Sequence, residues 1–206
     1  MSIFSHQYRA SSKRGFTLIE LLVVISIMMI ISAVLLFRQQ QFNSSTVLRS
    51  LGYSVALSIH QAQVYGISIK QDTSGQFAPA YGIYFNANNP SQYILFADVG
   101  GTGQYTGSSE NVQVFTLNQG YTVKNICGGS TDCSGSGSIT WMTIMFRRPN
   151  PEACIATSIH PTACAISGGT PAYASAYVQL SSQGGSTRGI TVSSTGEISV
   201  SNSAGS

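Results

Sequence analysis

Charged side chains are scarce in this sequence: only 8% of its 206 residues are Asp, Glu, Lys or Arg. The formal net charge is +3, but three of the ten basic residues precede Gly15, which leaves seven basic against seven acidic side chains in the rest of the chain. That balance argues against a strongly basic surface that would hold nucleic acid by counterion release. Because small and amide-bearing polar residues supply most of the polarity, the composition favours a secreted or surface protein built from strands and loops.

Histidine is also scarce, and the common catalytic motifs are missing. The three histidines are His6, His60 and His160, and none stands in a metal-ligand pattern such as H-x-x-x-H. No G-x-S-x-G elbow occurs. The segment Gly100–Gly103 lacks the Lys-Ser/Thr ending of a phosphate-binding loop, so it is interpreted as a turn. We therefore predict that the chain is not an enzyme, with no catalytic residue, no metal site and no cofactor.

Only four cysteines are present, and they form two groups that are close in sequence, Cys127 with Cys133 and Cys154 with Cys164. Both groups lie in stretches rich in Gly, Ser or Pro, where disulfides can close small loops. The spacings C-x5-C and C-x9-C fit no common zinc site. Four cysteines allow three connectivities, and the sequence does not choose among them. We predict the two local disulfides and an oxidising compartment.

A long apolar run extends from Phe16 to Phe37 and is interrupted by only four polar residues. As a helix it would span roughly 33 Å, which is enough to cross a bilayer. A secretory signal peptide would have a shorter apolar core followed by a small-x-small cleavage site. The basic residues that precede the run would stay cytoplasmic by the positive-inside rule, which sends the chain after Phe37 to the outer side.

The start of this run resembles a known signal. The segment Lys13-Arg14-Gly15-Phe16-Thr17-Leu18-Ile19-Glu20-Leu21-Leu22-Val23-Val24 is similar to the class III signal of type IV pilins and type II secretion pseudopilins. In that family a prepilin peptidase cuts after the glycine and methylates the new N-terminal amine. The resemblance implies cleavage between Gly15 and Phe16, with Phe16 as the methylated residue.

Glu20 lies inside the apolar run, where a carboxylate costs on the order of 2.5–3.5 kcal/mol and needs a partner. No basic side chain lies within the run. The α-amine of Phe16 on a neighbouring subunit could pair with it and set the stagger of a filament, which is the role that the family assigns to this glutamate. The alternative is that Glu20 only reaches toward the lipid headgroups from near the helix start.

The apolar run continues into an amphipathic helix, since Leu48, Leu51, Val55, Ile59 and Ala62 recur at three- and four-residue steps. We predict one helix from Phe16 to Tyr65 with Gly66 as its C-cap. Beyond it, strands are expected at Ile67–Lys70, Tyr81–Phe85, Gln92–Ala97, Val112–Leu117, Tyr121–Ile126, Ile139–Phe146, Ala174–Leu180, Arg188–Ser193 and Glu197–Ser201.

These elements predict an α+β fold, in which a long N-terminal helix packs on an antiparallel β-sheet. The expected organisation is a leader over residues 1–15, a membrane-spanning half-helix over 16–37, an amphipathic half-helix over 38–66 and a β-rich globular domain over 67–206.

The globular part is similar to minor pseudopilins and pilins of the GspH/FimT type. The matching segments are Leu48–Gly66, Tyr81–Phe85, Ile144–Phe146 and the hairpin Arg188–Ile198. The resemblance implies a filament subunit that is anchored by one pass in the cytoplasmic (inner) membrane, with its globular domain periplasmic or extracellular. Its expected partners are the prepilin peptidase and other pilins or pseudopilins.

Two alternatives to a minor structural subunit stay open, a major pilin and a filament-tip module that binds DNA. Members of the FimT type can bind DNA through basic residues near the C-terminus, and here Arg147, Arg148 and Arg188 are the candidate contacts. A solvent-exposed strand end is the preferred interpretation of these arginines, and nucleic acid is not the expected partner.

Overall fold

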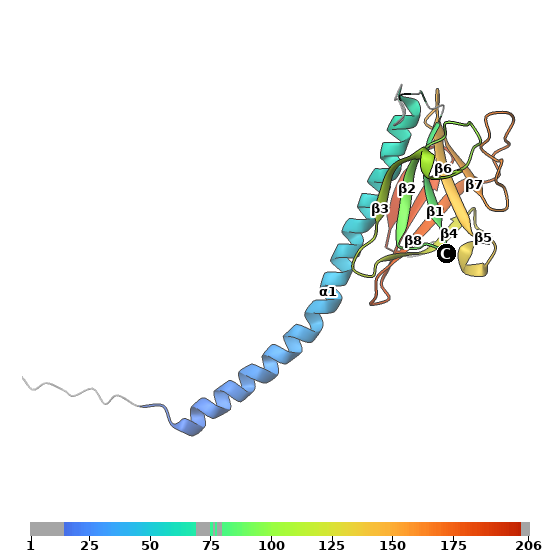
Figure 1. The fold of residues 1–206 in the computed structure, drawn as a ribbon. Helices are drawn as coiled ribbons and strands as arrows, with labels where there is room; N and C mark the ends of the chain where they lie inside the picture. The colour runs from blue at the N-terminus through green and yellow to red at the C-terminus, as the bar shows by residue number, and fades with distance from the viewer. Residues whose placement is uncertain (1–14, 69–74, 76, 78–79, 203–206) are drawn as a thin grey trace, which may run out of the picture. The chain divides into compact units, whose positions relative to one another are not determined.

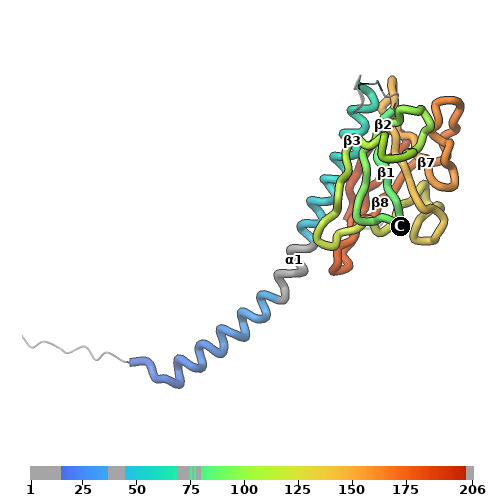
Figure 2. Tube along the Cα trace, viewed as in Figure 1, coloured from blue at the N-terminus to red at the C-terminus, as the bar shows by residue number. Residues whose placement is uncertain are grey.

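The computed structural model describes residues 15–68, 75, 77 and 80–202, and for residues 37–44 it gives the backbone alone. The predicted leader therefore lies outside the described residues except for Gly15. The chain divides into two units, Met1–Phe42 and Asn43–Ser206. Helix α1, Leu18–Ile67, begins in the first unit and ends in the second (Figure 1). The Cα trace shows the described parts of α1 in both units (Figure 2).

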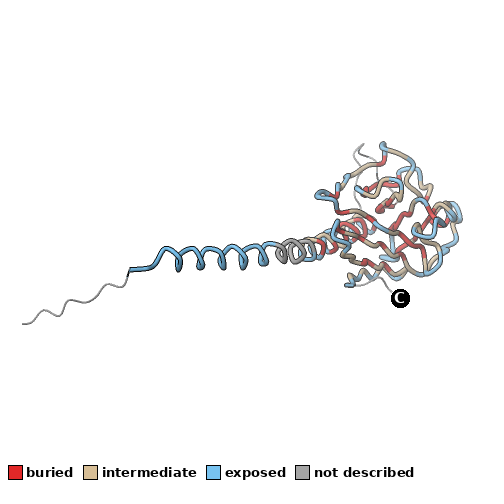
Figure 3. Tube along the Cα trace, turned by 90° about the horizontal axis from the view of Figure 1, so that it is seen from below, coloured by how far each residue is buried: buried red, intermediate tan, exposed pale blue. Residues whose placement is uncertain are grey.

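In the first unit, the stretch Leu18–Leu36 of α1 is apolar and exposes its side chains on every side. The stretch Leu18–Leu36 has a mean hydropathy of 2.8, and no residue of it is buried (Figure 3). A helix that is apolar all round belongs in a core or in a bilayer. Among the described residues this stretch is the one that is long and apolar enough to cross a membrane.

In the second unit, α1 turns one face to the core. Leu48, Val55, Ile59 and Ala62 are all buried, and their spacing of seven, four and three residues places them on one side of the helix. They pack in one cluster with residues from the strands. The predicted amphipathic helix is therefore present, and its apolar positions are the ones that contact the sheets.

The strands form two antiparallel five-stranded sheets rather than the single sheet that the sequence suggested. The first has the order β3-β2-β1-β6-β7 and the second β10-β9-β8-β4-β5. The strands are β1 (Ala80–Asn86), β2 (Gln92–Ala97), β3 (Asn111–Thr116), β4 (Thr122–Gly128), β5 (Asp132–Cys133), β6 (Trp141–Arg147), β7 (Ala153–Thr157), β8 (Ser175–Ser181), β9 (Thr187–Ser193) and β10 (Ile198–Ser201). The predicted α+β class with an apolar N-terminal helix is confirmed.

The differences from the expected elements have local causes. Strand β7 was not predicted because its sequence Ala-Cys-Ile-Ala-Thr is rich in alanine, which strands disfavour. The expected strand Ile67–Lys70 is wrong at its start, since Ile67 ends α1 and Ser68 forms a turn, while residues 69–70 lie outside the described residues. Gly66 is not a C-cap but lies in the last turn of α1, where a Cβ would come within 2.4 Å of the Phe146 carbonyl oxygen.

The first sheet is covered on both faces. On its inner face Ile83, Phe85 and Leu95 join the main core with α1 and the second sheet. On its outer face Ile94, Phe96 and Met145 form a second apolar cluster with Ala163 and other residues of the loop between β7 and β8. The period-2 alternation of strands explains why neighbouring residues of β2, such as Ile94 and Leu95, belong to different clusters.

Candidate functional site

The candidate processing site is the short segment that precedes α1. Residues 15–17 are not helical, and a Cβ on Gly15 would have no neighbour within 4 Å. The next side chain, Phe16, is 79% exposed. The peptide bond between Gly15 and Phe16 is therefore non-helical and accessible within the described residues, which are the conditions that a protease needs.

Thr17 caps the helix immediately after this bond. Its side-chain oxygen accepts a hydrogen bond from the backbone N–H of Glu20 at 3.3 Å, and its carbonyl oxygen accepts one from Leu21 at 3.2 Å. The spacing Thr-x-x-Glu is that of a capping box, in which the first side chain satisfies a backbone donor of the first turn. This role of Thr17 was not predicted, although the T-x-x-E pattern before an apolar run is a sequence signal for a capping box.

Glu20 occupies the third helical position and is exposed. Two effects favour a carboxylate there: the capping-box position and the positive end of the helix dipole. No salt bridge to Glu20 occurs within the described part of the chain. Ser26 is another polar residue of the apolar run. Its hydroxyl donates a hydrogen bond to the Val23 carbonyl oxygen at 2.8 Å, so this donor has its partner within the helix. The charge of the Glu20 carboxylate, by contrast, has no partner within the described residues.

Residues 10–36 match a family model described as the prokaryotic N-terminal methylation motif. The chain carries a type IV pilin-like prepilin signal. The motif covers the non-helical segment, the cap and the apolar half of α1, and it supports a type IV pilin-like subunit of a pilus or a secretion pseudopilus. No curated protein and no solved structure matches the chain significantly.

Beyond the prepilin signal, the structure joins the four cysteines in two local disulfides. Cys127 bonds to Cys133 and thereby links β4 to β5, where the two residues are also register partners. Cys154 of β7 bonds to Cys164 in the loop that covers the outer face of the first sheet. Neither bond crosses between the two groups.

Tyr173 connects the two disulfide-closed loops. Its hydroxyl donates to a carboxylate oxygen of Asp132 at 2.7 Å and lies 3.1 Å from the hydroxyl of Thr157. Its ring meets the ring of His160 edge-on, with centroids 5.5 Å apart. Burial raises the pKa of the Tyr173 hydroxyl, and the Asp132 carboxylate raises it further, so the hydroxyl stays a donor near neutrality. His160 therefore has a packing role beside Tyr173, and no sequence motif pointed to Tyr173 itself.

The three candidate DNA-contacting arginines do not converge. Arg147 and Arg148 line a hollow of about 610 Å³ together with Ser194 and Thr195, which follow the end of β9. Arg188 stands near the opposite end of β9, where its aliphatic stem lies against Gly52 of α1 and its guanidinium donates to Asn202. Ser194 lies six positions after Arg188, which corresponds to roughly 20 Å of extended chain.

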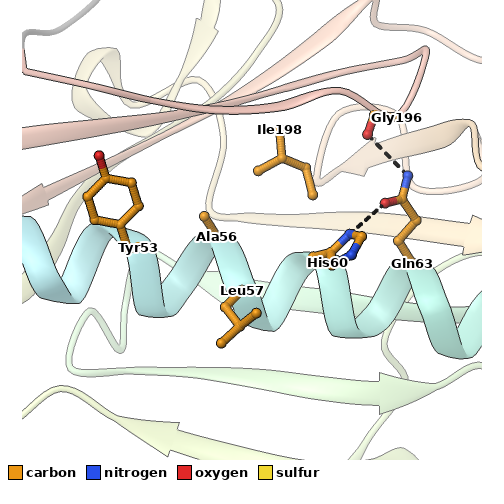
Figure 4. Close-up of a pocket in the computed structure, with 7 residues that line it drawn as sticks. All are labelled: Tyr53, Ala56, Leu57, His60, Gln63, Gly196 and Ile198. Atoms are coloured by element: carbon orange, nitrogen blue, oxygen red, sulfur yellow. Dashed lines mark hydrogen bonds between the residues drawn. The ribbon is translucent and has the colours of Figure 1, made fainter.

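His60 belongs to an open groove between α1 and the β9–β10 hairpin, with a volume of about 600 Å³ (Figure 4). Its ring nitrogen Nδ1 lies 3.0 Å from the side-chain oxygen of Gln63. The Gln63 amide donates in turn to the carbonyl oxygens of Pro151 at 2.9 Å and Gly196 at 3.1 Å. His60 thus orients a glutamine that ties the helix to the hairpin. The described residues contain no group of three His, Cys, Asp or Glu side chains that could hold a metal ion.

Proposed function

We propose that the chain is the precursor of a minor pilin or pseudopilin of the GspH/FimT type. In this proposal the prepilin peptidase cuts between Gly15 and Phe16, the amine of Phe16 is methylated, and the stretch Leu18–Leu36 holds the subunit in the cytoplasmic membrane until it enters a filament. The observation that carries the proposal is the methylation motif, in which an exposed non-helical Gly-Phe bond stands directly before a capped apolar helix.

The globular unit supports the choice of the GspH/FimT type. Three of the segments that resemble that type coincide with strands: Tyr81–Phe85 lies in β1, Ile144–Phe146 in β6 and Arg188–Ile198 in the β9–β10 hairpin. The amphipathic part of α1 ends on the backbone of β6, where Gly66 lies against Phe146. This is the order of helix, strands and terminal hairpin that the resemblance implies.

We propose a structural subunit rather than a DNA-binding tip module because the basic residues are dispersed. A phosphate backbone is held with useful strength by several clustered Lys or Arg side chains. Here Arg147 and Arg148 are adjacent, but Arg188 packs on α1, roughly 20 Å of strand from Ser194, which lines the same hollow as the other two arginines.

In assembly we propose that Glu20 faces the Phe16 amine of a neighbouring subunit. The carboxylate is exposed, lies in a stretch of membrane-spanning composition and has no salt-bridge partner among the described residues. A second copy of the chain, or a related subunit, supplies the missing cation once the new N-terminus is free. The oxidising side of the membrane suits the two disulfides.

Mass spectrometry of the mature N-terminus tests the proposal. We expect a chain that starts at a methylated Phe16 in cells that express a prepilin peptidase. Gly15→Val should leave the precursor uncut, because the peptidase must accept a residue without a side chain beside Phe16. Ser12→Val, which introduces valine three positions upstream, is the control and should still be processed. A mature chain that begins at another residue contradicts the proposal.

A further inference from the structure

The outer face of the first sheet is incompletely covered at the β1–β2 hairpin, where it forms a hollow of about 220 Å³. We call this the aromatic hollow. Its lining comes from alternate residues of two paired strands, from the turn between them and from the loop after β2: Tyr84, Asn86, Asn89, Gln92, Ile94 and Tyr105. Tyr84 and Ile94 are register partners, so their side chains share this face of the sheet. The prepilin signal plays no part in the hollow.

Three half-buried aromatic rings lie in or beside the aromatic hollow. The Tyr84 and Tyr105 rings have centroids 4.6 Å apart and are tilted by 32°, and the Trp141 ring lies 6.3 Å from that of Tyr84. The ring of Tyr105 also packs edge-to-face with the ring of the fully buried Phe96, and the two ring centroids are 5.5 Å apart. The three rings also pack on the second apolar cluster, and the parts of them that stay exposed offer contact to a ligand with an apolar face of its own.

The loop that carries Tyr105 is fixed by two buried carboxylates. Asp98 is fully buried and accepts hydrogen bonds from the backbone N–H groups of Thr102 and Gly103 at 2.9 and 3.0 Å. Glu110 is also buried and accepts one from the backbone of Thr106 at 2.7 Å. Tyr105 lies between these two anchored points, so its ring is held in place before any ligand arrives. Such preorganisation lowers the entropic cost of binding.

The polar part of the lining consists of amides and phenols. Gln92 makes no side-chain hydrogen bond to any residue that the structure describes, so its amide is available as donor and acceptor. The side-chain oxygens of Asn86 and Asn89 accept bonds from the Asn88 backbone and the Ser91 hydroxyl. The Asn86 side chain also bonds to the Tyr84 hydroxyl, so the amide of Asn89 is the more available of the two. Burial raises the pKa of the Tyr84 and Tyr105 hydroxyls, so both are neutral donors.

Sugars and the bases of nucleic acids both stack on aromatic rings, and the charge of the residues around the hollow distinguishes between them. No Lys, Arg, Asp or Glu lines the aromatic hollow. Asp98 and Glu110, which bond to the loop that carries Tyr105, are both acidic and disfavour a phosphate backbone there. A sugar ring instead offers C–H groups to the aromatic faces and hydroxyls to the amides, and it carries no charge.

We propose that the aromatic hollow binds a neutral saccharide, with one sugar ring against Tyr84 and Tyr105 and its hydroxyls bonded to Asn89 and Gln92. The chain has a single tryptophan, Trp141, which lies beside Tyr84, so its emission reports directly on the hollow. The experiment titrates the full chain in detergent with maltotriose, cellotriose and chitotriose while this emission is followed. We expect at least one of the three to shift it saturably, with a Kd of about 1 mM or tighter.

Variants locate the site. Gln92→Leu, which removes the free amide at similar size, should weaken binding by about 10-fold, and Tyr105→Leu should do so by at least that much. Tyr53→Leu is the matched control, because Tyr53 is an exposed tyrosine of α1 outside the hollow, and it should bind as the unaltered chain does. Gln92→Leu leaves the hydrogen bonds of the loop untouched, so it tests the proposal even where Tyr105→Leu disturbs folding.

Three results would overturn the proposal. An emission that none of the three trisaccharides changes would show that the hollow does not take neutral sugars. A shift that Gln92→Leu and Tyr53→Leu leave equally strong would place the sugar elsewhere. A shift produced by a thymidine oligonucleotide at low salt, and not by the sugars, would assign the rings to nucleobase stacking instead.

Discussion

The proposed pairing of Glu20 with a neighbour's amine can be separated from its helix-capping position by two substitutions. Glu20→Gln removes the charge but keeps a residue that a capping box accepts, whereas Thr17→Val removes the cap and keeps the charge. Both variants retain Gly15, Phe16 and the apolar stretch Leu18–Leu36, so cleavage and membrane anchoring should continue in each.

The two changes differ in expected magnitude. The Thr17 cap bond is long, at 3.3 Å, so its loss should cost about 0.5–1 kcal/mol, which is about a two- to fivefold effect on any equilibrium that needs the first turn. An ion pair at about 4 Å in partly screened surroundings contributes up to about 4 kcal/mol. If half of that survives desolvation, Glu20→Gln reduces incorporation by about 30-fold or more.

The assay compares the subunit in sheared filaments with the subunit left in membranes, in cells that carry each variant. Glu20→Val should insert as well as or better than the unaltered chain, since the carboxylate costs about 2.5–3.5 kcal/mol in a bilayer, and should also fail to assemble. Normal incorporation of Glu20→Gln would refute the ion-pair argument. Equal losses for Glu20→Gln and Thr17→Val would show that capping, not charge, is what assembly needs.

Three further outcomes are expected. Replacing either disulfide by two serines should lower the free energy of unfolding, by about 2 kcal/mol for the six-residue separation and about 3 kcal/mol for the ten-residue one; denaturant unfolding measures this, and no change would contradict the loop-entropy estimate. Burial raises the pKa of Glu110, so the folded state binds its proton more tightly and loses stability as pH rises through that pKa. Glu110→Gln should therefore raise the Tm at about pH 7 and give no such increase near pH 4. An equal increase in Tm at both pH values would count against the raised pKa. Duplex DNA should bind the full chain weakly and detach at physiological salt, because the part after the leader has seven basic and, outside Glu20, six acidic side chains. Binding that persists at physiological salt in the unaltered chain and is lost in Arg188→Ala would favour the DNA-receptor alternative.

The sequence was sufficient where a pattern has one physical meaning. The apolar run could only be a spanning or core helix, and the helical periodicity from Leu48 to Ala62 predicted the buried face of α1 correctly. Strand β2 was predicted with both of its bounds, Gln92–Ala97, because a run of aromatic and aliphatic residues is bounded there by turn residues.

The sequence was insufficient where tertiary contacts decide. Gly66 suggested a helix end, but the structure shows another reason for a glycine at this position. The helix backbone comes so close to the backbone of Phe146, 80 residues further along the chain, that a side chain would not fit. The division into two sheets depends on strand order, which local patterns do not encode. The aromatic hollow was missed for the same reason: Tyr84, Tyr105 and Trp141 are distant in sequence, and only the register of β1 with its neighbours brings Tyr84 and Trp141 to one face.

Tyr173 has a consequence for how the protein matures. Its hydroxyl bonds to Asp132 beside one disulfide and to Thr157, which lies within the loop closed by the other. Each loop therefore helps to position the tyrosine that positions the other loop. Oxidation of one cysteine pair would favour closure of the second, and reduction of either would loosen both. We expect this end of the protein to mature in one cooperative step, so partly oxidised chains should be rare.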